Sequence, residues 1–238
     1  MKHLNLILII LILSCCPLHP AYAFFDKDIR LLTMRDGLAD NTIPCIYKDE
    51  DGFMWFGTDD GLSRYDGKTI QNFKPADTYA SVAAIVRLSD DFLGIVSDGY
   101  LYYFNRKQET FLPIHTESDT AIGVFNVLPA DNSSFWGISG NRLILCQWEI
   151  RQGKEEEKTA VRVRIQKTFQ LLEEKGEVFS SLCYHEKAGN GIWLTTNRGN
   201  LILFHPDTPE AYQKIPLTDG KPLQVTSILN RDGVVWIS

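Results

Sequence analysis

The chain has 238 residues, of which 44% are hydrophobic and 23% are charged, and its formal net charge is −6 at pH 7. These proportions are typical of an ordinary globular protein and give no sign of disorder or low complexity. The weakly acidic balance argues against nucleic acid as a partner of this segment, because binding to phosphates normally requires a basic surface.

Residues 1–23 are predicted to be a signal peptide. Lys2 precedes an apolar run over residues 4–13, and Ala21-Tyr22-Ala23 has the small-x-small pattern that signal peptidase cleaves, so we expect cleavage after Ala23. The apolar run is shorter than the roughly 20 residues that a membrane span needs. Lipidation at Cys15 and retention as an uncleaved anchor are the alternatives.

The next segment, residues 28–38, is similar to residues 212–220 further along the chain. Both are interpreted as the outermost, fourth strand of a sheet followed by a loop. The mature chain is therefore expected to begin with an orphan fourth strand.

A block of sequence then recurs with a period of about 40 residues, which is typical of repeat architectures. Its first copy, residues 42–74, alternates four short β-rich runs with polar turns. The Asp51-Gly52 pair in the first turn favours a hairpin, because glycine accepts positive φ without steric cost. Four short antiparallel strands joined by tight turns form one blade of a β-propeller.

Further blades are predicted at residues 81–114, 124–170 and 178–217, and part of a fifth at 224–238. The second strand of each copy has an equivalent position, occupied in turn by Trp55, Gly94, Trp136, Trp193 and Trp236. We expect each indole to fill the space between neighbouring blades and to bury roughly 200 Å². The third copy is longer because its outer hairpin is extended, and the polar tip at 151–159 is interpreted as solvated.

The predicted fold is thus all-β, a partial β-propeller of about four four-stranded blades with an orphan N-terminal strand and part of a fifth blade, in an incomplete ring. Closed propellers built from blades of this type commonly need about 6–8 of them. Residues 24–238 are therefore expected to be the N-terminal part of a larger propeller domain. Unpaired strand edges would favour aggregation or a partner.

The residues that could carry chemistry are sparse. Cys45, Cys146 and Cys183 have neither disulfide nor zinc spacing and are interpreted as small buried hydrophobic residues. His115, His185 and His205 are isolated and interpreted as ordinary surface or turn histidines.

The sequence has no GxSxG nucleophile elbow, no Walker loop and no HExxH motif. The acidic pairs Asp59-Asp60 and Asp90-Asp91 are attributed to turns, and the 49–51 turn lacks the spacing of a known calcium loop. No catalytic, cofactor-binding or metal-binding residue and no cofactor is predicted, and the segment itself is not expected to be an enzyme.

Residues 32–43 and 49–67 together resemble the opening of a two-component regulator propeller. The resemblance implies a periplasmic sensor, the N-terminal part of a hybrid two-component histidine kinase. It also implies that further blades and a kinase follow in the parent chain and that the full-length protein can form a homodimer. The implied ligand is an oligosaccharide, which controls transcription of glycan-use genes through a phosphorelay.

Ligand groups are expected in the loops that lead into the first strands, such as residues 39–41 and 78–80. Two alternatives remain: a secreted propeller hydrolase or lyase acting on polysaccharide, and a non-catalytic interaction propeller of the cell envelope. A polysaccharide hydrolase would need two carboxylates facing each other across a pocket, which the sequence does not place.

Overall fold

The computed structural model of the protein describes residues 30–74, 81–116, 122–151, 160–185, 191–218, 223, 225–231 and 234–238. The predicted signal peptide, the hairpin tip at 152–159 and the loop at 78–80 lie outside these residues. Residues Met1–Leu32 and Thr33–Ser238 form separate units, and the sheets belong to the second. Nowhere in the described ranges is a helix both long and apolar enough to cross a membrane.

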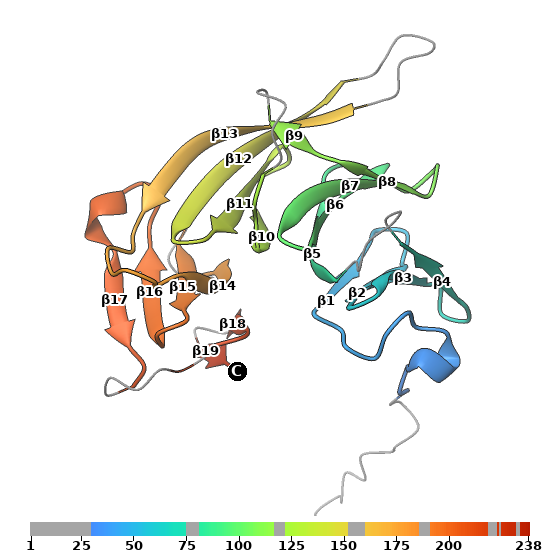
Figure 1. The fold of residues 1–238 in the computed structure, drawn as a ribbon, viewed down its shortest axis with the longest axis horizontal. Helices are drawn as coiled ribbons and strands as arrows, with labels where there is room; N and C mark the ends of the chain where they lie inside the picture. The colour runs from blue at the N-terminus through green and yellow to red at the C-terminus, as the bar shows by residue number, and fades with distance from the viewer. Residues whose placement is uncertain are drawn as a thin grey trace, which may run out of the picture. The chain divides into compact units, whose positions relative to one another are not determined.

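Each of the first four repeats forms a sheet whose strand order follows the chain (Figure 1). The first sheet contains β1 (Cys45–Lys48), β2 (Met54–Thr58), β3 (Gly61–Tyr65) and β4 (Ile70–Phe73). The second contains β5 (Val82–Arg87), β6 (Phe92–Ser97), β7 (Tyr100–Asn105) and β8 (Thr110–Pro113). All of these strands pair antiparallel, as consecutive hairpins must.

The third sheet contains β10 (Asn126–Pro129), β11 (Ser134–Ser139), β12 (Arg142–Arg151) and β13 (Ala160–Gln170), and a short strand, β9 (His115–Thr116), pairs parallel with β13. The fourth contains β14 (Phe179–Tyr184), β15 (Ile192–Thr196), β16 (Asn200–Phe204) and β17 (Gln213–Pro216). The last two strands, β18 (Ile228–Arg231) and β19 (Val234–Ile237), form a two-stranded sheet.

The first strands of successive sheets contact one another in chain order, β1 with β5, β5 with β10, β10 with β14 and β14 with β18. This is the arrangement of innermost strands in a propeller. The predicted fold class, an all-β partial propeller of four-stranded antiparallel blades, is confirmed.

The start of the chain differs from the prediction. No strand forms over residues 30–44; instead, Met34–Asp36 form a 3₁₀ helix, η2. Thr33 and Asp36 cap this helix reciprocally, and Gly37 ends it in the left-handed region at a φ of 110°. An outermost strand forms only by pairing with the third strand of a sheet. The third strands β3, β7, β12 and β16 already pair with their own fourth strands, so none of these four is available to residues 30–44.

The hydrophobic core is divided among the interfaces between blades. Separate buried clusters join the first sheet to the second, the second to the third, the third to the fourth, and the fourth to β18–β19. Among the described residues the core is thus divided into separate clusters, and each interface is filled by its own side chains.

Two interfaces are filled by the same arrangement of three aromatic rings, which we call the aromatic wedge. Between the first two blades, Trp55 on β2 lies 5.5 Å from Phe104 on β7 and 6.0 Å from Phe73 on β4, measured between ring centroids. Between the third and fourth blades the distances are 6.2 Å from Trp136 to Phe204 and 5.9 Å from Trp136 to Phe169. In each wedge, two rings come from one blade and the third from the next blade.

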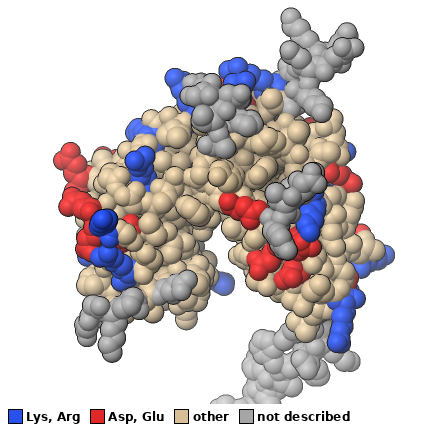
Figure 2. Space-filling model, viewed as in Figure 1, with Lys and Arg blue, Asp and Glu red and all other residues tan. Residues whose placement is uncertain are grey.

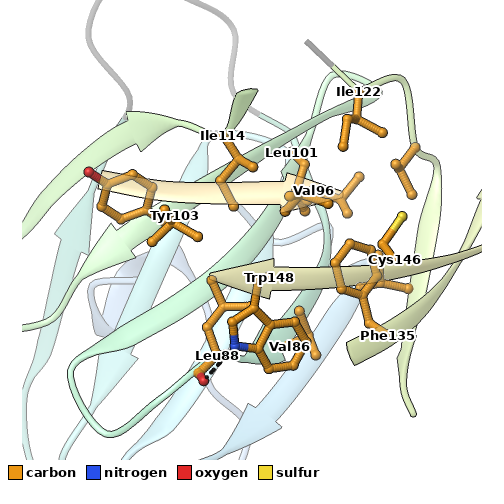
Figure 3. Close-up of a cluster of buried hydrophobic side chains, with 14 of the residues drawn as sticks. Val86, Leu88, Val96, Leu101, Tyr103, Ile114, Ile122, Phe135, Cys146 and Trp148 are labelled. Carbon is orange, nitrogen blue, oxygen red and sulfur yellow. Dashed lines mark hydrogen bonds between the residues drawn. The ribbon is translucent and has the colours of Figure 1, made fainter. Parts of the chain in front are cut away.

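The interface between the second and third blades lacks this wedge. Gly94 stands at the tryptophan position, and a Cβ atom there would lie 2.7 Å from Cγ1 of Val86. The ring is supplied from the next blade: Trp148 on β12 stacks on Phe135 at 5.8 Å and donates its Nε1–H to the Leu88 carbonyl at 3.1 Å (Figure 3). Trp148 thus compensates for the indole that the second repeat lacks.

The prediction that the tryptophans pack between blades is correct for Trp55, Trp136 and Trp193, which are buried, and wrong for Trp236, which is 64% exposed. Trp55 and Trp136 are each covered by a ring from their own fourth strand and one from the next blade. Trp236 lies on β19, which has neither cover among the described residues.

We predict that Trp136→Ala lowers the free energy of unfolding by about 3–5 kcal/mol, because it removes the largest ring of a buried wedge. Trp236→Ala is the matched control and should change this free energy by less than about 0.5 kcal/mol, because its indole is exposed. Urea denaturation of both variants measures the difference. Equal destabilisation by the two substitutions would contradict the wedge.

Candidate functional site: a polar groove at the turns of three blades

Three turns meet beside the interface between the first two blades. They are the β1–β2 turn (residues 49–53), the β5–β6 turn (88–91) and the β7–β8 turn (106–109). The first is fixed by its backbone: the Asp49 amide donates to the Phe53 carbonyl at 3.0 Å, and Gly52 adopts a φ of 89°. These turns lie at one end of the blades.

Asp49 is the centre of this region, and its side chain is 3% exposed. Its carboxylate accepts hydrogen bonds from the Phe53 amide at 2.8 Å, from Trp55 Nε1 at 2.7 Å and from Arg106 Nη2 at 2.9 Å. One carboxylate thus joins the turn, the wedge indole and the next blade. Because N–H donors already surround it, Asp49 is not arranged as a ligand for a cation.

Other charged side chains around Asp49 are also paired. Arg106 contacts Asp51 as well, and its Nη1 donates to the Asp90 carbonyl at 2.8 Å. Arg87 pairs with Glu50 at 3.3 Å and with Asp90. Lys107 pairs with Asp91 at 2.8 Å. The region is therefore an ion-pair network that links turns of two blades.

The network lines a cleft of about 430 Å³. A second hollow of about 500 Å³ adjoins it and shares Arg87, Ser89 and Asp90 with it. Leu88, and Pro129, Asp131 and Asn132 of the third blade, complete its lining. We call the two together the turn groove. Acidic and basic side chains lie side by side over the first two blades, as Figure 2 shows.

The charged side chains of the turn groove are donors and acceptors of hydrogen bonds. Within the described ranges, no group of three or more His, Cys, Asp or Glu side chains is placed to hold a metal ion. Asp49, the most buried acid of the groove, is neutralised by Arg106 rather than facing a second carboxylate across a pocket, the geometry that glycoside hydrolysis requires.

Residues 39–41, one of the two loops predicted to bind ligand, lie at the opposite end of the blades. The Asp59 amide in the β2–β3 turn donates to the Thr42 carbonyl, and the Ala39 amide donates to Ser63 Oγ. Asp40 accepts from the Thr42 amide at 2.7 Å, and this hydrogen bond lowers the pKa of its carboxyl group. Residues 39–41 are thus not brought together with the turn groove.

A second buried acid lies at this opposite end, in the fourth blade. Glu177 accepts hydrogen bonds from Thr196 Oγ1, Asn200 Nδ2 and Lys214 Nζ at 2.8, 2.6 and 3.0 Å. Arg198 nearby pairs with Glu174. These contacts hold the loop before β14 against the β15–β16 turn.

The three cysteines in the described ranges, Cys45, Cys146 and Cys183, form no disulfide and lie in apolar surroundings. Cys146 is buried, whereas Cys45 and Cys183 are half-buried. Burial raises the pKa of Cys45 and of Cys146 to about 12, so neither is a nucleophile near neutral pH.

Of the histidines, His185 departs from the interpretation as an ordinary surface residue. It follows β14 at a turn, but its ring lies 5.3 Å from that of Trp193, and its Nδ1 is buried without a hydrogen-bond partner among the described atoms. His205 is half-buried beside Gly191, and the side chain of His115 is outside the described set.

Sequence reasoning missed Arg106 and Trp148, which both contact the preceding blade. Each stands two residues after equivalent third-strand positions, Phe104 and Cys146, and each reaches the end of the preceding blade's first strand. Nothing in the repeat pattern marks this position, because an arginine and a tryptophan perform the same linking role with different chemistry.

The sheet arrangement defines the chain as part of a β-propeller, and comparisons with known proteins agree. The structure is similar to streptogramin B lyase, with a TM-score of 0.55 and 18% identity over 84% of this chain and 63% of the lyase. It is similar to the WD40 propeller domain of Doa1, with a TM-score of 0.57 and 10% identity over 82% of this chain and 60% of that domain.

The structure is also similar to the extracellular domain of a hybrid two-component system from B. thetaiotaomicron, with a TM-score of 0.52 and 17% identity. That alignment covers 87% of this chain and 34% of the other, so the chain spans about a third of that domain. At these identities the likeness concerns the fold.

A family model described as "Two component regulator propeller" matches residues 37–60, a span that contains both Asp49 and Trp55. Residues 37–60 are therefore similar to a two component regulator propeller repeat, which agrees with the resemblance seen in the sequence. No curated protein matches the chain in sequence.

We predict that Arg106→Ala lowers the free energy of unfolding by about 3 kcal/mol, because it leaves the buried Asp49 carboxylate without its cation. Lys107→Ala is the control, since Lys107 is the next residue and pairs with Asp91 in solvent; its loss should cost less than about 1 kcal/mol. Urea denaturation at one pH compares the two. A larger loss for Lys107→Ala would refute the role assigned to Arg106.

Proposed function

We propose that this chain is a ligand-sensing propeller segment from the periplasmic part of a two-component histidine kinase. The observation that carries the proposal is the family match at residues 37–60, which covers the first strand, the Asp49 turn and the wedge tryptophan of the first blade. Similarity of fold to the extracellular domain of a hybrid two-component system supports it. The predicted signal peptide would deliver the segment to the periplasm.

The finer parts of the proposal follow from the family resemblance. The ligand is an oligosaccharide, the signal passes to a kinase in the same parent chain, and a phosphorelay then controls transcription of glycan-use genes. A homodimer of the full-length protein would bring two kinases together. The segment contributes ligand binding and no catalytic step.

Signalling by such a segment needs a ligand that prefers one of two arrangements of the parent protein. A ligand with equal affinity for both arrangements shifts nothing, however tightly it binds. Each blade is held to the next by its own interface cluster, so blades can transmit a shift at one interface to the next.

A lyase or hydrolase remains the second candidate, because the fold is also similar to that of streptogramin B lyase. The two candidates differ in what happens to the ligand. A sensor releases its ligand unchanged, whereas an enzyme returns a cleaved product.

The test uses the full-length protein in membrane vesicles with a panel of oligosaccharides. We expect at least one oligosaccharide to bind in calorimetry, to be recovered intact, and to change the rate of autophosphorylation from ATP. Cleavage of the ligand, or ligand binding without any effect on phosphorylation, would contradict the sensor assignment.

A further inference from the structure

We infer that the turn groove is a binding site for a neutral oligosaccharide, at the end of the blades opposite to the loops at residues 39–41. This inference rests on the proposed sensor function and adds to it a place and a ligand charge. It is argued from the size, charge and fixed geometry of the groove.

The groove has the dimensions of a site for several linked units. Its first hollow, about 430 Å³, lies within the roughly 300–1,000 Å³ that small-ligand sites occupy. The second, about 500 Å³, continues past the β5–β6 turn to the β10–β11 turn of the third blade. Arg87, Ser89 and Asp90 line both hollows and mark their junction. An elongated ligand that crosses three blades fits this shape better than a compact one.

The charge of the lining selects against ionic ligands. The first hollow is lined by five carboxylates and four cations: Asp49, Glu50, Asp51, Asp90 and Asp91 with Arg64, Arg87, Arg106 and Lys107. A carboxylate or sulfate group in the groove would face carboxylates, and an amine would face guanidinium groups. A hydroxyl group donates one hydrogen bond and accepts others, so it can use both kinds of side chain. Hydrogen bonds to ionised partners are also the stronger ones.

The groove also offers an aromatic side chain. Tyr47 on β1 is half-buried and lines the groove, whereas Leu93 on β6, which also borders it, is buried. The C–H face of a sugar ring can lie on such a side chain while its hydroxyl groups reach the surrounding charged side chains. A lining of purely ionic groups would not distinguish a sugar from water.

The polar groups of the groove are already positioned. Asp49 is held by three donors, and Arg106 is held by Asp49, Asp51 and the Asp90 carbonyl. Glu50 and Asp90 are well exposed on the groove side of the network and leave oxygen atoms available to a ligand. Binding to groups that are fixed in advance avoids much of the entropic cost of ordering them.

The experiment compares Arg87→Ala and Asp90→Ala with a control at the other end of the blades. Arg198→Ala is matched to Arg87→Ala, because each arginine pairs with an acidic side chain and their side chains are 43% and 42% exposed. Calorimetry of the full-length protein uses neutral xylo-, manno-, cello- and arabino-hexaoses and, for comparison, sulfated chondroitin hexasaccharide. Circular dichroism confirms that each variant is folded.

We expect the native protein to bind at least one neutral hexaose. Arg87→Ala and Asp90→Ala should each weaken that binding by at least about 10-fold, the usual effect of losing a charge-assisted hydrogen bond. Arg198→Ala should leave it within about twofold.

Three results would overturn the inference. Unchanged binding by both groove variants, with loss in Asp40→Ala, would place the ligand at the loops and leave the sensor proposal intact. Preferential binding of the sulfated hexasaccharide would refute the neutral ligand. Absence of any binding by the native protein would refute the groove site, and the response of autophosphorylation to periplasmic extract would then decide separately whether the protein is a sensor.

Discussion

The structure depends on the contact between an aromatic ring of one blade and a ring of the next. A single four-stranded sheet buries little apolar surface. Each sheet therefore packs its apolar side chains against the neighbouring sheets. The wedges of Trp55 with Phe104 and of Trp136 with Phe204 do this at equivalent places in two interfaces. A large ring between two sheets fills the space between them and buries a large apolar area.

The second interface shows that this constraint belongs to the space between blades and not to one sequence position. The repeat has Gly94 and Cys146 where the other interfaces have a tryptophan and a phenylalanine. Trp148 enters from the third blade, stacks on Phe135 and caps the Leu88 carbonyl. Arg106 occupies the equivalent position one blade earlier and binds Asp49, so the same contact also builds the polar network of the turn groove. The same position of the repeat therefore contributes to the packing between two blades in one case and to the candidate site in the other.

The sequence was sufficient to predict the blades, because the period, the turn residues and the tryptophan of the second strand are local signals. It could not predict the partners across an interface, since Phe104 and Trp148 meet Trp55 and Leu88 only after the sheets are placed side by side. The predicted orphan strand was wrong for a related reason: a strand forms only by pairing, and within the described ranges residues 30–44 pair with no other strand. The groove was missed because Asp49 was interpreted as a turn residue and Arg106 carries no motif. The sequence analysis expected ligand groups at residues 39–41, which lie at the other end of the blades.

The most direct test of the account is a double-mutant cycle between Trp55 and Phe104, which lie on neighbouring blades. The account predicts that Trp55→Ala and Phe104→Ala, combined, destabilise the protein by about 0.5–3 kcal/mol less than the sum of their separate effects in urea denaturation. Trp55→Ala with Trp136→Ala, which are in different wedges, should be additive within about 0.5 kcal/mol. Additivity of the Trp55 and Phe104 substitutions would show that the rings act independently and would contradict the wedge as the constraint on this fold.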